Sequence, residues 1–222
     1  MDTRPYHATY GEAQRLFPDP ILYDMEDPSW FKNIRLTQES ISCMTPYKIA
    51  KNISYRIIQR YIQYYNKHPT TIVDATANVG GNCLSFSKEM DTVLAIEIKK
   101  DTCDMLRHNI MLYNRQNVKI AQGDCKKLIP SYASLLGSKP DIVFIDPPWF
   151  IEGKPNTTMS LQTTLSNYMM SIDETIINIW KYYPSAMVAI KVPKKYKTAL
   201  LPVSIIYLKK MNILVYCNVD IT

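Results

Sequence analysis

The sequence lacks the cysteine and histidine spacings that build disulfide frameworks and zinc sites. Its five cysteines are an odd number without any Cys-x-x-Cys pair, and its three histidines stand in unrelated contexts. Such a set argues against a disulfide scaffold and against a bound metal. We therefore expect free thiols, no metal, and a reducing intracellular compartment, cytoplasmic or nuclear.

Long apolar runs, internal repeats and low-complexity segments are also missing. No stretch reaches the roughly 20 apolar residues that span a bilayer, and the N-terminus has no apolar segment of the signal-peptide type. We expect no membrane partner. The many Lys, Ile, Asn and Tyr residues indicate an AT-rich genome, such as that of a protist or of a large DNA virus acting in the infected cell.

What is present is an ordinary globular composition. The chain has 222 residues, of which 46% are hydrophobic and 21% are charged. This size fits a single domain with a short extension, and we expect a monomer. The net charge of +6 is compatible with an anionic partner such as RNA, although the lysines occur in short pairs rather than in one basic run.

The chain after residue 46 alternates between strand-like and helix-like patterns. Apolar residues at helical spacing predict a helix over 47–66, with Pro46 in its first turn and Thr45 as its N-cap. Segments 203–208 and 213–219 have no helix between them and predict an antiparallel hairpin. Further helices are predicted over 82–90, 101–114, 125–136 and 165–182, and strands over 71–75, 92–98, 118–122, 141–145 and 186–192.

This alternation predicts an α/β fold with right-handed crossovers between parallel strands. A seven-stranded, mainly parallel sheet that ends in an antiparallel hairpin is the Rossmann-like plan of class I methyltransferases. We expect residues 47–222 to form this domain and residues 1–46 to form an irregular N-terminal extension packed on the core.

Acidic residues end three successive predicted strands. Asp74 opens the small-residue turn DATANVGGN, which lacks the G-x-G-x-x-G spacing of dinucleotide sites, and its carboxylate can bind an ammonium group. Glu97 can accept both hydroxyls of a ribose, and Asp124 lies where it can reach an adenine edge. The alternatives are that Glu97 is a surface charge facing Lys99 or Lys100, and that Asp124 caps the next helix.

A proline-rich tetrapeptide, Asp146-Pro147-Pro148-Trp149, follows the predicted strand 141–145, at the edge where open α/β sheets bind ligands. The Asp146 carboxylate and the rigid Pro147 carbonyl offer two acceptors, and Trp149 offers a stacking face. They suit the exocyclic amino group of a nucleobase, with its lone pair aimed at an electrophile. With the three acidic strand ends, they favour S-adenosylmethionine as the cofactor. The alternative is that the prolines only end the strand and that Trp149 fills the core.

Three segments resemble those of the RNA cap guanine-N2 methyltransferases, the trimethylguanosine synthase family. Val73-Asp74-Ala75 followed by Val79-Gly80-Gly81-Asn82 is similar to the family motif D-A-x-x-G-V-G-G-N, and Pro147-Pro148-Trp149 matches its P-P-W element. The segment from Glu39-Ser40 through Met44-Thr45-Pro46 to Lys48-Ile49-Ala50 is similar to its E-x-W-x-S-V-T-P-E-x-I-A motif. The likeness runs from Glu39 to Trp149. The chain departs from the family at five places: Ile41 replaces Trp, Tyr47 replaces Glu, Ala77-Asn78 replaces Cys-Gly, Asp146 replaces Ser, and Phe150-Ile151 replaces Gly-Gly.

The resemblance implies an enzyme that transfers the methyl group of S-adenosylmethionine to the exocyclic N2 of a 7-methylguanosine RNA cap. Capped RNA is then its expected partner, and residues 47–222 are the S-adenosylmethionine-dependent domain. Methylation of ribosomal-RNA guanine N2 or of nucleic-acid adenine N6 stays open, because Asp-Pro-Pro-aromatic also occurs in such enzymes. A further alternative is an inactive module that binds caps or RNA.

The resemblance also assigns roles to individual residues. Asp146 and the Pro147 carbonyl are expected to orient the amino group, and Trp149 to stack on the guanine. Pro148 is expected to contact the substrate, and the lysines after the fifth strand either bind the cap phosphates or form a solvated loop; these lysines are Lys194, Lys195 and Lys197. The cofactor is expected to be held by Asp74, Gly80, Asn82 and Glu97, covered by Thr45, and approached at its adenine by Asp124.

Overall fold

The chain folds around one seven-stranded sheet. The computed structural model describes residues 6–18, 29–151, 154–157, 161, 170–198 and 200–218. The strands follow the order β3-β2-β1-β4-β7-β9-β8; the first five are parallel, and β9 runs antiparallel to β7 and β8. This arrangement confirms the predicted α/β fold. The strands are β1 (Thr71–Asp74), β2 (Thr92–Glu97), β3 (Val118–Gln122), β4 (Ile142–Ile145), β7 (Met187–Pro193), β8 (Ser204–Tyr207) and β9 (Met211–Tyr216).

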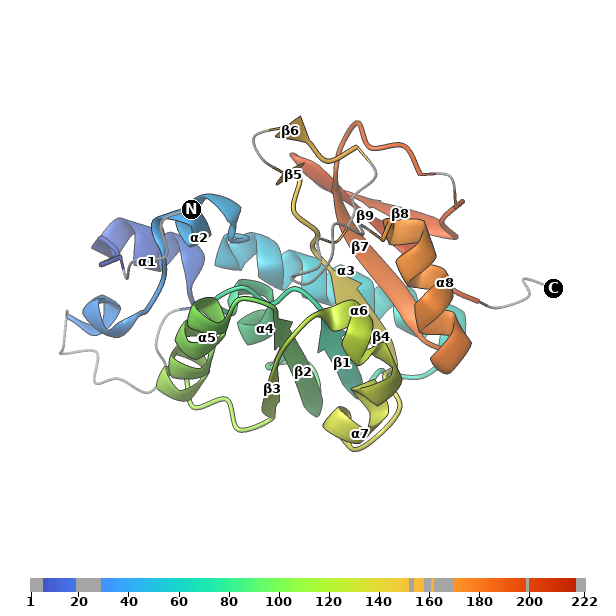
Figure 1. Cartoon of the computed structure of the whole chain (residues 1–222), viewed down its shortest axis with the longest axis horizontal. Coiled ribbons are helices and arrows are strands. Elements are labelled where there is room, and N and C mark those ends of the chain that lie inside the picture. Colours follow the sequence, from blue (N-terminus) through green and yellow to red (C-terminus); the bar gives the residue numbers. More distant parts are fainter. Residues whose placement is uncertain are drawn as a thin grey trace.

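Helices cover both faces of the sheet (Figure 1). Successive strand residues point to opposite faces, so that Ile72 of β1 packs in one apolar layer and Val73 packs in the other. Because both faces are covered, the central strands are apolar along their length. One layer contains α3 (Tyr47–Tyr65), α4 (Gly81–Phe86) and α5 (Lys100–Leu112), and the other contains α6 (Cys125–Leu128), α7 (Tyr132–Leu136) and α8 (Ile172–Tyr182).

The N-terminal segment is more regular than the sequence predicted. Thr9 and Thr37 accept hydrogen bonds at the starts of its two α-helices, and its apolar side chains Leu16 and Trp30 are buried in the same layer as α3. The expectation of irregular structure was wrong, because helices of six or seven residues have too few turns to show an apolar period. The elements are α1 (Tyr10–Leu16), the 3-10 helix η1 (Trp30–Asn33) and α2 (Gln38–Cys43).

Several element bounds differ from the prediction. The helix predicted over 125–136 is split into α6, the 3-10 turn η2 (Ile129–Ser131) and α7, because Pro130 lies in the first turn of η2. The helix predicted over 82–90 ends at Phe86, and α8 begins after a capping box formed by Ser171 and Glu174. The second hairpin strand begins at residue 211 rather than 213. Residues 1–5, 19–28, 165–169 and 219 of the predicted segments lie outside the described residues.

The strand order places a ligand-binding edge next to β1 and β4. These strands are neighbours, yet the chain leaves β1 toward β2 on one side and continues from β4 to β7 on the other. Open α/β sheets bind ligands at such a switch point, outside the carboxyl ends of the strands. After β4 the chain forms a small separate hairpin of β5 (Phe150–Ile151) and β6 (Lys154–Pro155) beside this edge.

Candidate active site

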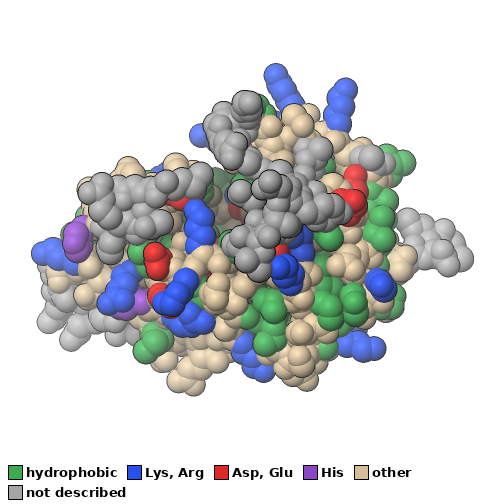
Figure 2. Space-filling model, viewed as in Figure 1, with side chains coloured by type: hydrophobic (Ala, Val, Ile, Leu, Met, Phe, Trp, Pro, Cys, Tyr) green, Lys and Arg blue, Asp and Glu red, His purple; other side chains and the backbone are tan. Residues whose placement is uncertain are grey.

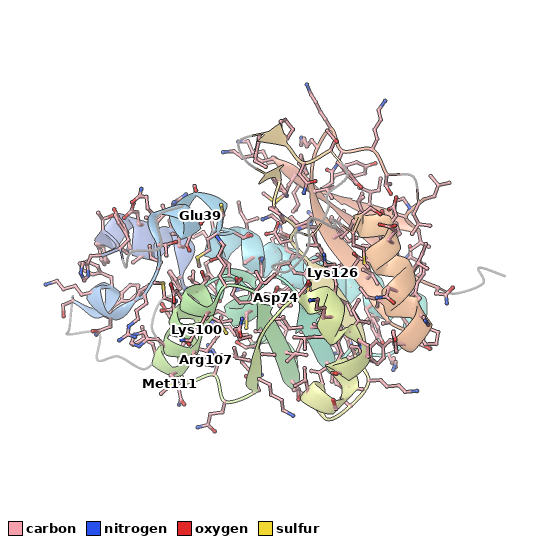
Figure 3. The ribbon with its side chains drawn as sticks, viewed as in Figure 1. Glu39, Asp74, Lys100, Arg107, Met111 and Lys126 are labelled. Carbon is pink, nitrogen blue, oxygen red and sulfur yellow. The ribbon has the colours of Figure 1, made fainter. Side chains whose placement is uncertain are left out.

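The predicted acidic side chains gather at the carboxyl edge of the sheet. Asp74 ends β1, Glu97 ends β2, Asp146 follows β4 directly, and Asp124 follows β3 after one glycine. The carboxylates of Asp146 and Glu97 both act electrostatically on Asp74. Figure 3 shows Asp74 at this edge, between α2 on one side and α6 on the other.

Asp74 is fully buried and only partly hydrogen-bonded. Its Oδ1 accepts a long 3.4 Å hydrogen bond from the backbone N–H of Thr76, and no donor among the described residues reaches its Oδ2. Burial, assisted by the carboxylates of Asp146 and Glu97, raises the pKa of Asp74 to about 7. An incoming cation would stabilise the ionised form, so the residue fits an ammonium group better than a phosphate.

Glu97 is buried, with 8% of its surface exposed. Its Oε1 accepts the N–H of Lys99 at 2.9 Å, and its Oε2 accepts the N–H of Asn78 at 3.0 Å. The interpretation of Glu97 as a surface charge facing Lys99 or Lys100 is therefore wrong, because the side chain is buried. The Lys99 ammonium forms its ion pair with Glu39 at 3.1 Å. Burial raises the pKa of Glu97, although these N–H groups oppose the shift. Each carboxylate oxygen keeps a lone pair for a ribose hydroxyl.

The turn after β1 is shaped by one asparagine and two glycines. Asn78 has a φ of 49° and Gly80 a φ of 108°, both in the left-handed region, which asparagine and glycine adopt more readily than other residues. The Asn78 Oδ1 accepts the Ser40 hydroxyl at 3.1 Å, which ties the turn to α2. A Cβ on Gly81 would lie 2.8 Å from Cγ of Met44. Gly81 therefore lets the segment before α3 lie directly against this turn.

Asp124 caps the helix that follows it, as the structural alternative predicted. Its Oδ1 accepts the N–H of Lys126 at 3.1 Å at the start of α6. Its Oδ2 is buried and has no hydrogen-bond partner among the described residues. The cap thus occupies one oxygen and leaves the other for a ligand.

Lys191 of β7 is a site residue that the sequence analysis missed. Its side chain is 6% exposed, and its Nζ donates to Oδ2 of Asp146 at 2.6 Å and to Oγ1 of Thr45 at 2.8 Å. The ammonium also lies 5.3 Å from the ring centre of Trp149. The prediction that Thr45 caps α3 was wrong, because Pro46 is the N-cap and the Thr45 hydroxyl binds Lys191. A lysine inside a predicted buried strand was the available signal, since lysine is seldom buried unless paired.

Asp146 is held in a buried ion pair with Lys191. Its side chain is 15% exposed, and its backbone N–H donates to the Thr76 hydroxyl at 2.8 Å. Burial raises the pKa of Asp146, while the Lys191 ammonium and side-chain hydrogen bonds from Asn82 and Thr45 lower it. The charged form of this acceptor therefore depends on Lys191.

Asn156 forms two hydrogen bonds that fix the residues after Asp146. Its Nδ2 donates to the Pro148 carbonyl at 2.7 Å, and its N–H donates to the Trp149 carbonyl at 2.8 Å. Among the described residues no donor reaches the Pro147 carbonyl, which is an available acceptor as expected. Trp149 is partly buried and packs against both apolar layers, whereas Phe150 is 63% exposed.

Buried polar atoms without partners are concentrated in this site. Within the part of the chain that the structure describes there are eight such side-chain atoms, and four belong to Asp74, Asn82, Asp124 and Trp149. Buried polar groups in proteins are nearly always hydrogen-bonded, so these atoms indicate a ligand that supplies the missing partners. The set of hydrogen-bond acceptors, with three carboxylates at the ends of successive strands, fits the ammonium, ribose and adenine of S-adenosylmethionine.

The remaining predicted substrate residues, Pro148, Lys194 and Lys195, are exposed. Lys194 and Lys195 form an exposed turn directly after β7, and their contact with phosphate stays a prediction. Among the described residues, no group of His, Cys, Asp and Glu side chains is arranged to hold a metal ion. None of the described helices combines the length and the apolar character that crossing a membrane requires.

Comparison with known proteins identifies the same family as the motifs. The model of the RNA cap guanine-N2 methyltransferase family matches residues 69–202. The trimethylguanosine synthase of Schizosaccharomyces pombe is 32% identical over 122 residues, which cover 53% of this chain and 47% of that protein. An uncharacterized protein of Acanthamoeba polyphaga mimivirus is 32% identical over 125 residues, which cover 56% of this chain and 46% of that protein. The chain thus spans about half the length of these curated relatives.

Solved structures show the same fold at low sequence identity. An rRNA methyltransferase of Streptomyces viridochromogenes has a TM-score of 0.54 at 12% identity, covering 78% of this chain and 84% of that one. A SAM-dependent methyltransferase of Neisseria gonorrhoeae has a TM-score of 0.52 at 17% identity, covering 78% of this chain and 73% of that one. These likenesses confirm the class I methyltransferase fold.

Proposed function

The chain belongs to the RNA cap guanine-N2 methyltransferase family, whose members use S-adenosylmethionine, and we propose that it methylates the exocyclic N2 of a 7-methylguanosine RNA cap. The observation that carries this proposal is the group formed by Asp146, the Pro147 carbonyl and Trp149. Two acceptors and an aromatic ring follow β4, beside the acidic ends of β1 and β2. This is the chemistry that an amino group on a flat base requires.

The proposed cofactor site uses the acidic strand ends. S-adenosylmethionine supplies a methyl group on a positively charged sulfur when it is bound. We assign the Asp74 carboxylate to its ammonium, Glu97 to its ribose hydroxyls, and the free oxygen of Asp124 to the adenine edge. The turn containing Gly80 and Asn82, together with the segment at Thr45, lies around these groups and completes the cofactor site.

On the acceptor side, Asp146 and the Pro147 carbonyl hold the two N–H bonds of the base amino group. Lys191 favours the ionised form of Asp146, so a charged acceptor would orient the amino nitrogen. As this nitrogen forms its new bond to the methyl carbon, the S–C bond of the cofactor would break and leave a neutral thioether. Most of the rate then comes from alignment and electrostatics, since the nitrogen need pass its extra proton to water only after it has become positively charged. The Trp149 ring stacks on the base and fixes its plane. Pro148 and the lysines Lys194 and Lys195 extend this side toward the cap phosphates.

The first prediction concerns the order of modification. The 7-methylguanine ring is cationic and gains a cation–π interaction with Trp149 of roughly 1–2 kcal/mol when desolvated, which corresponds to about 5- to 30-fold in kcat/KM over unmethylated guanine. The measurement is labelled-methyl transfer to 7-methylguanosine cap analogue, unmethylated cap analogue, ribosomal RNA and DNA side by side. Equal efficiency on the two cap analogues would contradict this assignment.

The same assay tests a second acceptor class. The chain has Asp146 where the family commonly has serine, and a carboxylate at this position also suits guanine N2 in ribosomal RNA or adenine N6 in nucleic acid. Transfer to ribosomal RNA or DNA but not to either cap analogue would favour this class. No transfer to any acceptor, with S-adenosylmethionine still bound in a titration, would favour an inactive module that binds caps or RNA.

The second prediction separates stacking from core packing at Trp149. If the ring stacks on the base, Trp149→Ala should lose about 1–3 kcal/mol of transition-state binding, measured as kcat/KM, and Trp149→Phe should recover part of it. Cofactor affinity should stay unchanged in both variants. If the ring mainly fills the core, Trp149→Ala should instead cost about 3–5 kcal/mol of folding stability. Thermal unfolding and transfer rates are measured together; activity that merely follows the folded fraction would contradict the stacking role.

A further inference from the structure

One surface outside the candidate active site combines arginine with exposed tyrosine. A groove of about 310 Å³ lies between α3 and β8, and we name it the α3–β8 groove. Tyr55 is 61% exposed and Tyr207 is 69% exposed. The residues that line the groove are Tyr55, Arg56, Gln59, Arg60, Ile205, Ile206 and Tyr207.

The walls of this groove contain no acidic residue. Residues 40–73, which include all of α3, and residues 203–218, which include β8 and β9, have no Asp or Glu, although the chain has 20 acidic residues. On the face shown in Figure 2, by contrast, acidic and basic side chains lie among one another. The two acid-free segments are brought together by the fold: the Tyr64 hydroxyl of α3 donates to the carbonyl of Val203 at 3.3 Å.

The two arginines have only neutral partners among the described residues. Arg56 donates from Nε to Oδ1 of Asn52 at 3.0 Å and from a terminal nitrogen to the Tyr207 carbonyl at 3.4 Å. Arg60 donates to Oε1 of Gln63 at 2.6 Å. These contacts hold the side chains in place without neutralising their charge. A guanidinium in this state is well suited to phosphate.

We propose that the α3–β8 groove binds the single-stranded RNA that carries the acceptor base. Arg56 and Arg60 contact its phosphates, and Tyr55 and Tyr207 stack on its bases. Aromatic side chains beside a positively charged groove are the recurring way in which proteins hold single strands, because every base has a face to stack. The inference rests on RNA as the substrate class of the proposed function, but not on the cap as the acceptor.

Helix α3 connects this groove with the candidate active site. The helix begins at Tyr47, two residues after Thr45, whose hydroxyl binds Lys191 in the site, and Tyr55 lies further along the same helix. The nine residues of helix from Tyr47 to Tyr55 span about 13 Å. An RNA strand several nucleotides long can therefore reach from the base on Trp149 to the groove.

The third prediction is tested by equilibrium binding of an uncapped, unstructured 20-nucleotide RNA, followed by fluorescence anisotropy at several salt concentrations. For the double variant Arg56→Gln/Arg60→Gln, the slope of log affinity against log salt should fall by about 1.4, since each phosphate contact on a single strand contributes about 0.7. Tyr55→Ala and Tyr207→Ala should each weaken binding about 5- to 100-fold without changing the slope, because stacking releases no counterions. Tyr55→Leu should not restore the affinity, since it keeps apolar volume but has no ring.

The control is Lys181→Gln, which removes the positive charge of an exposed side chain on α8, in the other layer. It should leave affinity and slope close to those of the wild type. In methyl transfer, the arginine variant should raise KM for a capped 20-nucleotide RNA and leave KM for a cap dinucleotide analogue unchanged. Wild-type affinity and slope in the arginine variant would overturn the proposal and favour an acidic protein as the occupant of the groove. Failure of cap methylation alone would contradict the proposed acceptor and would leave the RNA-binding result to stand.

Discussion

Replacing Lys191 by methionine is expected to lower the free energy of unfolding by about 3–5 kcal/mol, because removal of one partner leaves a buried carboxylate without a counterion. Methyl transfer should fall roughly 100-fold beyond the loss of folded protein, the size of effect that a misplacement of about 1 Å produces. The pair concerned is Lys191 and Asp146, whose atoms are 2.6 Å apart with side chains 6% and 15% exposed. Urea unfolding and steady-state transfer rates measure the two effects.

The pH dependence distinguishes a positioning role for Lys191 from a purely structural one. Without the ammonium the pKa of Asp146 should rise further, because Lys191 is the largest influence that lowers it. The pH at which transfer reaches half of its maximum should then shift upward. The free energy of unfolding of Lys191→Met should also fall as the pH rises above about 3.9, which is the pKa of an Asp carboxyl in an unfolded chain. The reason is that the folded state binds the Asp146 proton more tightly than the unfolded state does. An unshifted pH profile in Lys191→Met would contradict the positioning role.

Two further variants act as controls for this prediction. Asp146→Asn/Lys191→Met removes both charges, so it should regain much of the stability lost in Lys191→Met, because neutral replacement of a buried pair is often tolerated. Its methyl-transfer rate should stay low. Its pH profile should show no shift of the kind expected for Lys191→Met, because the Asp146 carboxyl is absent. Lys100→Met removes an exposed ammonium that pairs with Asp104, and it should change neither stability nor activity appreciably.

Replacing Asp74 by asparagine is expected to stabilise the cofactor-free protein above pH 7 by roughly 4 kcal/mol. The pKa of Asp74 is about 7, compared with about 3.9 in an unfolded chain, so the folded state holds this proton more tightly. The stability that this bound proton contributes to the folded state is fully present below about pH 4 and is lost as the pH rises to about 7. The measurement is urea unfolding of wild type and Asp74→Asn at pH 5 and pH 8, where only the difference between the two proteins reports on Asp74.

The same substitution should weaken S-adenosylmethionine binding about 10- to 100-fold, since a hydrogen bond to a charged group contributes about 1.5–3 kcal/mol. In the wild type, affinity should increase as the pH rises through 7, because the ionised carboxylate binds the ammonium. In Asp74→Asn this increase should be reduced. Calorimetry at pH 6 and pH 8 measures both, with exposed Asp91→Asn as the control. Unchanged affinity together with unchanged stability would show that Asp74 neither keeps its proton nor binds the cofactor.

The sequence by itself determined the class of fold and the edge of the sheet where the candidate site lies. Apolar runs such as 141–145, followed by turn residues, are local signals, and buried strands produce them whatever their neighbours are. Asp74, Glu97 and Asp146 could be placed for the same reason, because the end of a strand is visible in the residues around it.

Only the tertiary structure decided which of these groups act on one another. Ile190 pairs with Ile145, so the register of β7 on β4 brings Lys191 beside Asp146, although the two residues are 45 positions apart. The same lysine takes the Thr45 hydroxyl away from the helix that it was expected to cap. The α3–β8 groove similarly joins Arg56 to Tyr207 across 151 positions. Such contacts follow from strand order and register, which depend on how whole layers pack and are absent from the local patterns of hydrophobicity, turns and caps.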